Sequence, residues 1–473
     1  MTLERNRIPD DVKRIHLIAV CGTGMGALAC MFKDLGYEVT GSDQRAYPPM
    51  SRFLEDKGII VSDGFHEDNL LYGPDLVVVG NAVIRDNPEA KKMNAMGLNF
   101  CSMPQAINHF IVADKKTILV TGTHGKTSTT ALITWILENA GLNPSFFIGG
   151  ILNNFQSNYQ LGSGAYMVIE GDEYDTAYFN KVPKFYHYQP ALAVLTNIEF
   201  DHADIYKNLD EIVKVFDHFI QHLSDRSKLF AYDDDQRIES LLGKSRCEVH
   251  RYGKRMESFH RLGKVMTVAD ETRFEVVKNG NLFGRFTTPL YGEHNLLNAT
   301  AAVAVADALG IPEHGIAEAL KTFKGVKRRQ EIRGKKRGIT VLDDFAHHPT
   351  AVRETIRAVK SSHPRNRLIA VFEPRTHASM RKVFQDIYPL SFDEADIICI
   401  PHPSMLHKIP ENDRFSSSKL VEDLKARGKD AHFFNDTTAI IDFLVQTAKP
   451  EDLVLIMSNG GFDNIHERLL AAL

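Results

Sequence analysis

The stretch VTGTHGKTSTT at 120–130 joins a glycine-rich turn to a lysine and a row of hydroxyl side chains. Backbone N–H groups of such a turn can face phosphate oxygens, while Lys126 can neutralise them and the Thr127 hydroxyl can reach Mg²⁺. A plain helix cap explains it poorly, because one hydroxyl suffices and a lysine cation is disfavoured at a helix N-terminus. The stretch is shorter than the usual phosphate loop, G-x-x-x-x-G-K-[ST]. It nevertheless predicts an ATP site made by Gly122, Thr123, His124, Gly125, Lys126, Thr127 and Ser128.

Acidic and histidine side chains follow two further predicted strands. Glu173 lies in IEGDEYD and His202 lies in NIEFDHAD. The carboxyl ends of parallel strands meet at one edge of a sheet, so both side chains are expected near the phosphate loop. Mg²⁺ prefers oxygen ligands, and the predicted metal ligands are Thr127, Glu173 and His202. A buried, hydrogen-bonded acid is the alternative interpretation.

A second glycine motif lies near the N-terminus. Gly22, Thr23, Gly24, Met25 and Gly26, followed by alanine, fit G-x-G-x-x-G/A between a predicted strand and helix. Asp43 follows Gly24 by 19 residues, where an acid can hydrogen-bond a ribose. These residues predict a diphosphate site at a helix N-terminus. The motif leaves NAD and a UDP-sugar open, and a tight turn without a ligand is the alternative.

The elements that must position these residues are short β-branched runs alternating with helical patterns. This alternation predicts an α/β fold with parallel sheets and crossover helices. Three blocks can be separated, at 1–112, 113–327 and 328–473. In each block the polar motifs come at the ends of predicted strands, where open parallel sheets bind their ligands.

Composition limits the class of protein. A length of 473 residues fits about three domains, and every apolar run is too short to cross a bilayer. The N-terminal segment lacks the features of a secretory signal, and five scattered cysteines fit a reducing compartment, so a cytoplasmic location is expected. A net charge of -4 gives no attraction for nucleic acid. The basic run KRRQEIRGKKR at 327–337 is interpreted mostly as a solvated linker.

The motifs TGTHGKT, DEYD, NIEFDHAD, GEHNLLNAT, KRRQE and DDFAHHPT, in this order, resemble the Mur ligases across all three blocks. The resemblance implies a Rossmann-like UDP-sugar domain, a central P-loop ATPase domain and a Rossmann-like C-terminal domain for the incoming amine. It implies ATP and Mg²⁺, with Lys126, Glu173, His202 and Arg329 as catalytic residues. His294, Asn295, Asn298, Arg329 and Asp344 would contact ATP, and the Gly22–Gly26 motif with Asp43 would hold the UDP-sugar.

Other stretches resemble the family members that attach a tripeptide. These are GDEYDTAYFNKVPKFYHYQP, FEPRTHASM and MSNGGFDNIHERLL, with Tyr174 where members that add L-alanine carry serine. The implied substrates are UDP-N-acetylmuramate and L-alanyl-γ-D-glutamyl-meso-diaminopimelate. Arg375 could clamp a peptide carboxylate and His347 could contact the peptide. Asp217 occupies the position of a carbamylated lysine in several relatives, so that role is not transferred.

Three alternatives are kept. A nicotinamide-dependent oxidoreductase would use the first glycine motif but leaves GTHGKT unexplained. A P-loop ATPase would hydrolyse ATP without forming an amide. A ligase adding L-alanine differs only in its C-terminal residues. The sequence leaves open the oligomeric state, with a monomer as one option, and the diamino acid and peptide length accepted.

Overall fold

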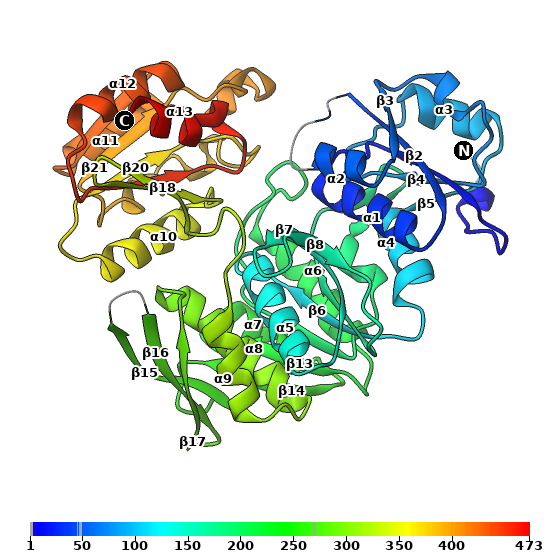
Figure 1. Cartoon of the computed structure of the whole chain (residues 1–473), viewed down its shortest axis with the longest axis horizontal. Coiled ribbons are helices and arrows are strands. Elements are labelled where there is room, and N and C mark those ends of the chain that lie inside the picture. Colours follow the sequence, from blue (N-terminus) through cyan, green and yellow to red (C-terminus); the bar gives the residue numbers. More distant parts are fainter. Residues whose placement is uncertain (1–2, 45, 47–49, 269–270) are drawn as a thin grey trace.

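The computed structural model describes residues 3–44, 46, 50–268 and 271–473, and its strands form three main sheets in chain order (Figure 1). The first sheet is wholly parallel, with the order β3-β2-β1-β4-β5. Its strands are β1 (Arg14–Ile18), β2 (Glu38–Asp43), β3 (Ile60–Asp63), β4 (Leu76–Val79) and β5 (Phe100–Ser102). Its helices are α1 (Thr23–Asp34), α2 (Met50–Asp56), α3 (Pro88–Ala95) and α4 (Met103–Ile107).

The middle sheet has ten strands in the order β17-β16-β15-β14-β13-β12-β6-β9-β7-β8. Its central strands are parallel, and antiparallel pairs extend it at both ends. The strands are β6 (Lys116–Thr121), β7 (Ser145–Leu152), β8 (Ser157–Gln160), β9 (Tyr166–Glu170), β12 (Leu192–Leu195), β13 (Lys228–Tyr232), β14 (Glu248–Gly253), β15 (His260–Val268), β16 (Glu271–Lys278) and β17 (Asn281–Thr288). A separate hairpin joins β10 (Asp175–Ala177) to β11 (Asn180–Pro183). The helices are α5 (Lys126–Asn139), α6 (Leu209–His222), α7 (Gln236–Leu242), α8 (Glu293–Ala308) and α9 (Glu313–Thr322).

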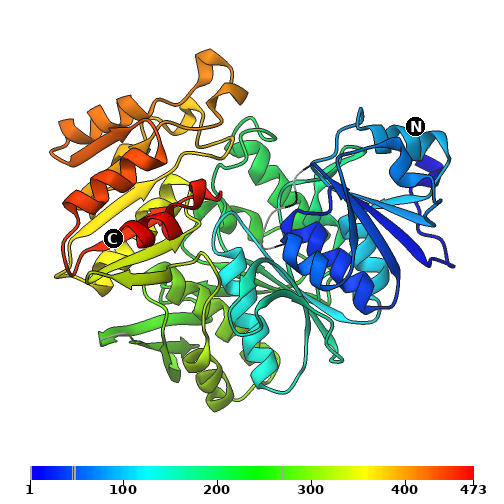
Figure 2. The ribbon, with the colours of Figure 1, turned by 45° about the horizontal axis from the view of Figure 1, so that its top comes forward.

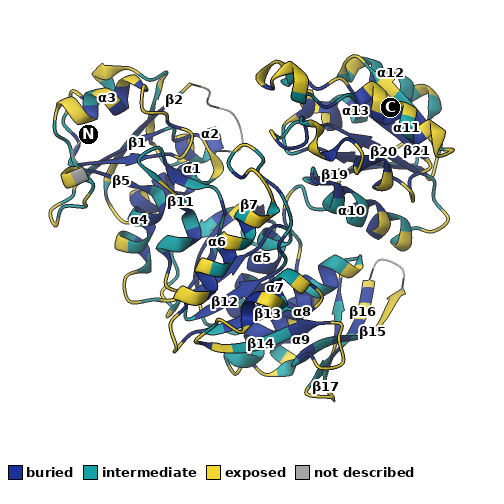
Figure 3. Ribbon diagram, turned by 180° about the vertical axis from the view of Figure 1, so that it is seen from behind, coloured by how far each residue is buried: buried dark blue, intermediate teal, exposed yellow. Residues whose placement is uncertain are grey.

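The last sheet has the order β18-β19-β23-β20-β21-β22 and is parallel except for β18. Its strands are β18 (Glu331–Lys336), β19 (Ile339–Asp344), β20 (Leu368–Phe372), β21 (Ile397–Pro401), β22 (Asp430–Phe434) and β23 (Leu453–Met457). The helices are α10 (Pro349–Ser362), α11 (Ser417–Ala426), α12 (Thr437–Thr447) and α13 (Ile465–Ala472). Figure 3 shows the strands of the sheets largely buried, with exposed residues on the outer helices, as parallel sheets covered on both faces require.

The three sheets are joined in different ways. One apolar core runs from Leu28 on α1 to Phe147 on β7, so the first sheet's helices pack directly on the middle sheet. The last sheet has cores of its own on its two faces, and only a few apolar side chains of the middle part reach them. Figure 2 shows the first and last parts on opposite sides of the middle part. The polar contacts described below therefore supply much of the seam between the middle and last sheets.

One expectation holds and one needs correction. Parallel strands form the first sheet and the centre of the other two, as expected, while β15–β17, β8 and β18 add antiparallel pairs at the sheet edges. The basic run is not simply a linker, because its residues 331–336 form the edge strand β18, although most of its cations are exposed, as expected. Arg328 donates to Ser458 O at 2.6 Å and Arg333 pairs with Asp343 at 3.2 Å. Arg328 and Arg333 therefore bind a carbonyl group and an acid of the last part of the chain.

Other expectations can be compared with the structure. All five cysteines are buried and none forms a disulfide. Among the described residues, no helix has the length and apolarity needed to cross a bilayer. The predicted boundary near residue 112 lies between α4 and β6, and the one near 327 lies between α9 and β18. These boundaries stay predictions of where one folding unit ends.

Candidate active site

The phosphate loop lies between β6 and α5, at the carboxyl edge of the middle sheet. Gly122 and Gly125 have φ values of +124° and +82°, which disfavour any residue with a side chain. A Cβ on Gly122 would lie 2.2 Å from Thr196 Oγ1, and one on Gly125 would lie 2.5 Å from Asn298 Oδ1. Both glycines are therefore needed for the path of the loop, and Asn298 is held against it.

Lys126, the first residue of α5, directs its ammonium back into this loop. Its Nζ donates to the carbonyl of Gly122 at 2.6 Å and to that of Thr123 at 3.1 Å, and lies 2.8 Å from Glu173 Oε2. Burial alone would lower the pKa of Lys126, but the carboxylates of Glu173 and Asp172 raise it above its ordinary value. The loop therefore holds a buried cation, as a site for a polyphosphate requires.

His202 faces the same carboxylate. Its Nε2 lies 3.5 Å from Glu173 Oε1, its φ is +54°, and the Tyr174 ring packs against its imidazole at 4.0 Å between centroids. Burial alone would lower the pKa of His202, but the carboxylates of Glu173 and Asp201 raise it to about 9. The structure thus brings together Glu173 and His202, as the strand-end argument predicted.

Asp172 joins these two residues. One ligand atom each from Asp172, Glu173 and His202 lie within 4.8 Å of one another, a spacing that suits a single cation. Lys184 lies 2.8 Å from Asp172 Oδ2. Burial alone would raise the pKa of Asp172, but Lys184 and Lys126 lower it to about 2. The sequence analysis quoted this aspartate only as part of an acidic cluster.

Thr127 has a different acidic partner. Its hydroxyl donates to Glu170 Oε1 at 2.9 Å, and the other carboxylate oxygen accepts the Gly149 amide at 2.7 Å. Burial raises the pKa of Glu170. The guanidinium of Arg329 reaches over from the last part and lies 3.4 Å from Thr127 Oγ1. Oxygen atoms dominate this edge, with His202 as the one imidazole among the candidate ligands, so the donor set fits Mg²⁺.

The predicted adenine-side residues lie at the start of α8. Asn295 Nδ2 donates to Tyr291 O at 3.0 Å and to Gln330 Oε1 at 3.1 Å, which links α8 to the residues before β18. Burial lowers the pKa of His294 to about 4, so its imidazole is neutral at pH 7. Asn298 Oδ1 lies against Gly125 of the phosphate loop. Contact of these three residues with ATP stays a prediction.

Asp344, at the end of β19, accepts hydrogen bonds from two backbone amides. Its Oδ2 accepts the Gln330 amide and its Oδ1 accepts the Ala346 amide, each at 2.8 Å. Burial raises the pKa of Asp344. The carboxylate thus fixes the backbone beside Arg329, and its predicted contact with a ribose is untested.

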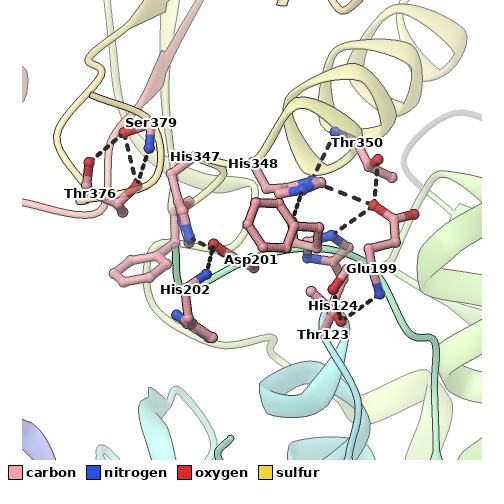
Figure 4. Close-up of polar contacts among 12 residues, drawn as sticks. Thr123, His124, Glu199, Asp201, His202, His347, His348, Thr350, Thr376 and Ser379 are labelled. Carbon is pink, nitrogen blue, oxygen red and sulfur yellow. Dashed lines mark hydrogen bonds and ion pairs between the residues drawn. The ribbon is translucent and has the colours of Figure 1, made fainter. Parts of the chain in front are cut away.

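A polar cluster joins the middle and last sheets (Figure 4). His124 of the phosphate loop lies 3.3 Å from Glu199 Oε2, and Thr350 donates its hydroxyl to the same oxygen at 2.7 Å. His348 Nε2 lies 3.0 Å from Phe200 O. Burial alone would raise the pKa of Glu199, but the hydrogen bond and charge of His124, together with the Thr350 hydroxyl, help lower it to about 2. Glu199 and Thr350 lie in the motifs NIEFDHAD and DDFAHHPT, but their residue types and spacing did not predict them as site residues.

The predicted peptide residues lie on two sides of this cluster. His347 Nε2 lies 3.7 Å from Asp201 Oδ2, at the seam. Arg375, beyond β20, lies 3.4 Å from Glu373 Oε1 and covers Gly460, where a Cβ would come within 2.1 Å of its Nε. The adjacent strands β20 and β23 therefore bring Arg375 and the 458–460 turn together. Whether they hold a peptide remains untested.

The N-terminal glycine motif opens α1 as expected. Gly22 is the N-cap of this helix and Thr23 its first residue. A Cβ on Gly26 would lie 2.8 Å from Met50 Cε and 3.2 Å from the carbonyl oxygen of Val20. Asp43, at the end of β2, accepts the Cys21 amide at 2.8 Å and so lies beside the turn. The arrangement suits an anion at the start of α1, and its ligand stays a prediction.

Asp217 lies on α6 and pairs with Lys244 at 2.9 Å. Its carboxylate also accepts Gln221 Nε2 at 2.9 Å. Asp217 therefore forms a surface ion pair with Lys244, and this pair accounts for its carboxylate. No ligand role is assigned to it.

Together these contacts define an edge where a buried lysine, an arginine and oxygen-rich acids surround a phosphate loop. Such a set can bind a nucleoside triphosphate with a divalent cation and stabilise charge during phosphoryl transfer. The cluster of Figure 4 places residues of the last sheet against this edge, and closer approach of that sheet would limit the access of water. No hydride-transfer cofactor is needed to explain these residues.

Comparisons with known proteins agree across the chain. Residues 14–115 match the Mur ligase family catalytic domain, 120–306 the Mur ligase middle domain, and 328–460 the Mur ligase glutamate ligase domain. The chain is 39% identical over 463 residues to a UDP-N-acetylmuramate–L-alanyl-gamma-D-glutamyl-meso-2,6-diaminoheptandioate ligase of Escherichia coli (strain K12), covering 97% of this chain and 98% of the relative.

Two further relatives bear on specificity. A UDP-N-acetylmuramate–L-alanine ligase of Geotalea uraniireducens is 33% identical, with 98% of each chain covered. The crystal structure of a murein peptide ligase from Psychrobacter arcticus 273-4 is 33% identical and superposes with a TM-score of 0.74, again covering 98% of each chain. Similarity to these proteins extends over all three sheets.

Proposed function

This chain belongs to the Mur ligase family, and we propose that it joins L-alanyl-γ-D-glutamyl-meso-diaminopimelate to the lactyl carboxylate of UDP-N-acetylmuramate in peptidoglycan recycling. The reaction would convert ATP to ADP and phosphate. The observation that carries the proposal is the buried Lys126–Glu173 pair beside His202, inside a phosphate loop covered by the last sheet. This is an edge suited to making and protecting an acyl phosphate.

The reaction has two bond-forming steps. A lactyl carboxylate oxygen attacks the γ-phosphorus of ATP, the bond to ADP breaks, and an acyl phosphate forms. The peptide's amine then attacks the acyl carbon, and phosphate leaves from the tetrahedral intermediate. Mg²⁺, held by residues drawn from Thr127, Glu170, Asp172, Glu173 and His202, would neutralise phosphate charge.

The chain's own residues position these groups. Lys126 would place its cation on the phosphates, and Arg329 lies within 3.4 Å of Thr127 Oγ1, where it can reach the same phosphates. The first sheet would hold the UDP moiety between Gly22 and Asp43. Arg375, beside the 458–460 turn, would bind a peptide carboxylate with its planar fork. The buried, unpaired cysteines fit an enzyme of the reducing cytoplasm.

The choice of a tripeptide over L-alanine is supported by two observations. Identity is 39% to the tripeptide-adding relative and 33% to the alanine-adding one. Tyr174 is the residue that differs in the alanine-adding pattern, and its ring packs on His202 at the reacting edge. A bulky aromatic side chain there changes the space available to the incoming amine.

The test is phosphate release from ATP, Mg²⁺ and UDP-N-acetylmuramate, with the tripeptide or with free L-alanine, and mass measurement of the product. We expect tripeptide-dependent release with little response to alanine. Robust turnover with alanine would instead identify a ligase of de novo synthesis. Release without any amine would leave an ATPase.

A further inference from the structure

The segment 199–203, which follows β12, is held from both sides. On the middle-sheet side, the Glu199 amide donates to Thr123 Oγ1 at 2.8 Å, and that hydroxyl lies 3.2 Å from Glu199 O. The segment also carries His202, whose backbone has the strained φ of +54°. Its conformation therefore affects both the phosphate loop and the imidazole that faces Glu173.

Side chains of the last sheet hold the other side of this segment. Thr350 donates to Glu199, His348 contacts Phe200 O, His347 faces Asp201 and Arg381 donates to Ala203 O at 2.6 Å. Four of the five residues in the segment are contacted in this way. His202 is the exception, which leaves its ring directed toward Glu173.

The hydrogen bonds of His348 define its tautomer. The Thr350 amide donates to Nδ1 at 3.2 Å, so the ring proton is on Nε2 and is donated to Phe200 O. Burial lowers the pKa of His348 to about 3, which keeps the ring neutral. Its 3.6 Å approach to Glu199 is therefore not an ion pair. His348 both caps α10 and ties that helix to segment 199–203.

The same side chains could be considered as a metal site, because ligand atoms of His124, Glu199 and His348 lie within 4.8 Å of one another. Two of these ligand atoms already accept hydrogen bonds, however. Glu199 Oε2 accepts the Thr350 hydroxyl, and His348 Nδ1 accepts the Thr350 amide. A hydrogen-bonded junction between the sheets explains all these contacts, so no cation is needed.

We propose that Thr350 and His348 are positioning residues for ligation. They hold segment 199–203 so that His202 faces Glu173 and His124 stays fixed to Glu199 while the last sheet covers the phosphate loop. The inference rests on the proposed ligase activity but not on which amine is used. The contacts that dock the last sheet therefore also fix the geometry of the phosphate site.

The test compares Thr350→Val, which removes the hydroxyl at constant shape, with Thr350→Ser, which retains it. Loss of the hydrogen bond to the Glu199 carboxylate should lower kcat by about tenfold in the valine variant, while serine restores most of it. The KM for UDP-N-acetylmuramate and the thermal midpoint should stay near those of the wild type. His348→Asn should behave like Thr350→Val, because asparagine can cap α10 but is too short to reach Phe200 O.

A double-mutant cycle decides whether Thr350 acts through Glu199. Adding Thr350→Val to Glu199→Gln should lower kcat little further than Glu199→Gln alone. Additive losses, or a kcat for Thr350→Val within twofold of the wild type, would overturn the proposal. The assay uses whichever amine the wild-type enzyme accepts, so a failure of the tripeptide assignment is seen separately in the wild type.

Discussion

The Lys126 ammonium lies 2.8 Å from the Glu173 carboxylate, and these side chains are 11% and 2% exposed. A buried ion pair contributes little net stability, but removal of one partner leaves the other charge buried and unpaired. The pair therefore links catalysis to folding at the base of the phosphate loop. The effect of the pair on catalysis and its effect on stability can be separated by mutation.

We predict that Lys126→Met lowers ligation by at least about 100-fold, because a cation facing the transferred phosphoryl group is lost. It should also destabilise the protein by about 3–5 kcal/mol, because the buried Glu173 loses its nearest cation and keeps only His202. The double variant with Glu173→Gln should recover the unfolding midpoint but not the activity. Calorimetric titration should show that UDP-N-acetylmuramate still binds. Normal turnover in Lys126→Met would remove the phosphate-loop assignment.

Glu170→Gln tests the oxygen ligand that sequence analysis did not select. The amide can still accept from Thr127 but lacks the charge that attracts Mg²⁺. We expect the Mg²⁺ concentration for half-maximal activity to rise by about tenfold. Glu318→Gln, an exposed change on α9, is the matched control. An unchanged Mg²⁺ dependence would show that Glu170 only anchors Thr127.

Arg375→Lys tests the proposed peptide clamp. Lysine keeps the charge but loses the planar fork, so the KM for the tripeptide should rise about tenfold with kcat nearly unchanged. The KM values for ATP and the UDP-sugar should not move. Arg357→Lys on the exposed side of α10 controls for the general loss of a guanidinium. A tripeptide KM within twofold of the wild type would argue against the clamp.

Glu89 on α3 predicts a pH dependence of stability away from the active site. It is fully buried, and although burial alone would raise its pKa, the nearby His16 imidazole and hydrogen bonds from Ser42 and Asn69 hold the pKa below its ordinary 4.5. A depressed carboxyl pKa stabilises the folded state above pH 4.5, and this stabilisation is lost as pH falls through the folded value.

Glu89→Gln should therefore lower the thermal midpoint at pH 7 by about 5 °C. The difference from the wild type should shrink as the pH falls below about 4, measured by circular dichroism. Glu318→Gln again provides the control. A difference that stays constant from pH 7 to pH 3.5 would mean that the Glu89 charge contributes nothing.

The sequence by itself determined the α/β class, the phosphate loop and the roles expected of Glu173 and His202. These follow from local rules: glycines and Lys126 are contiguous, and polar residues after buried strands must emerge at the carboxyl edge of a parallel sheet. The sequence also identified Tyr174 as part of the DEYD motif. It did not predict that the Tyr174 ring packs on His202. Family membership then followed from motifs spread over all three blocks.

Only the tertiary structure decided which distant side chains meet. Thr350 and Glu199 are 151 residues apart, and their hydrogen bond depends on how the last sheet docks on the middle one. The partners of the basic run were hidden for the same reason, because the acid that binds Arg333 lies on β19 and the carbonyls that bind Arg328 lie in the turn after β23. Charge and spacing along the chain specify what a residue can do, while packing between separate cores selects its partner.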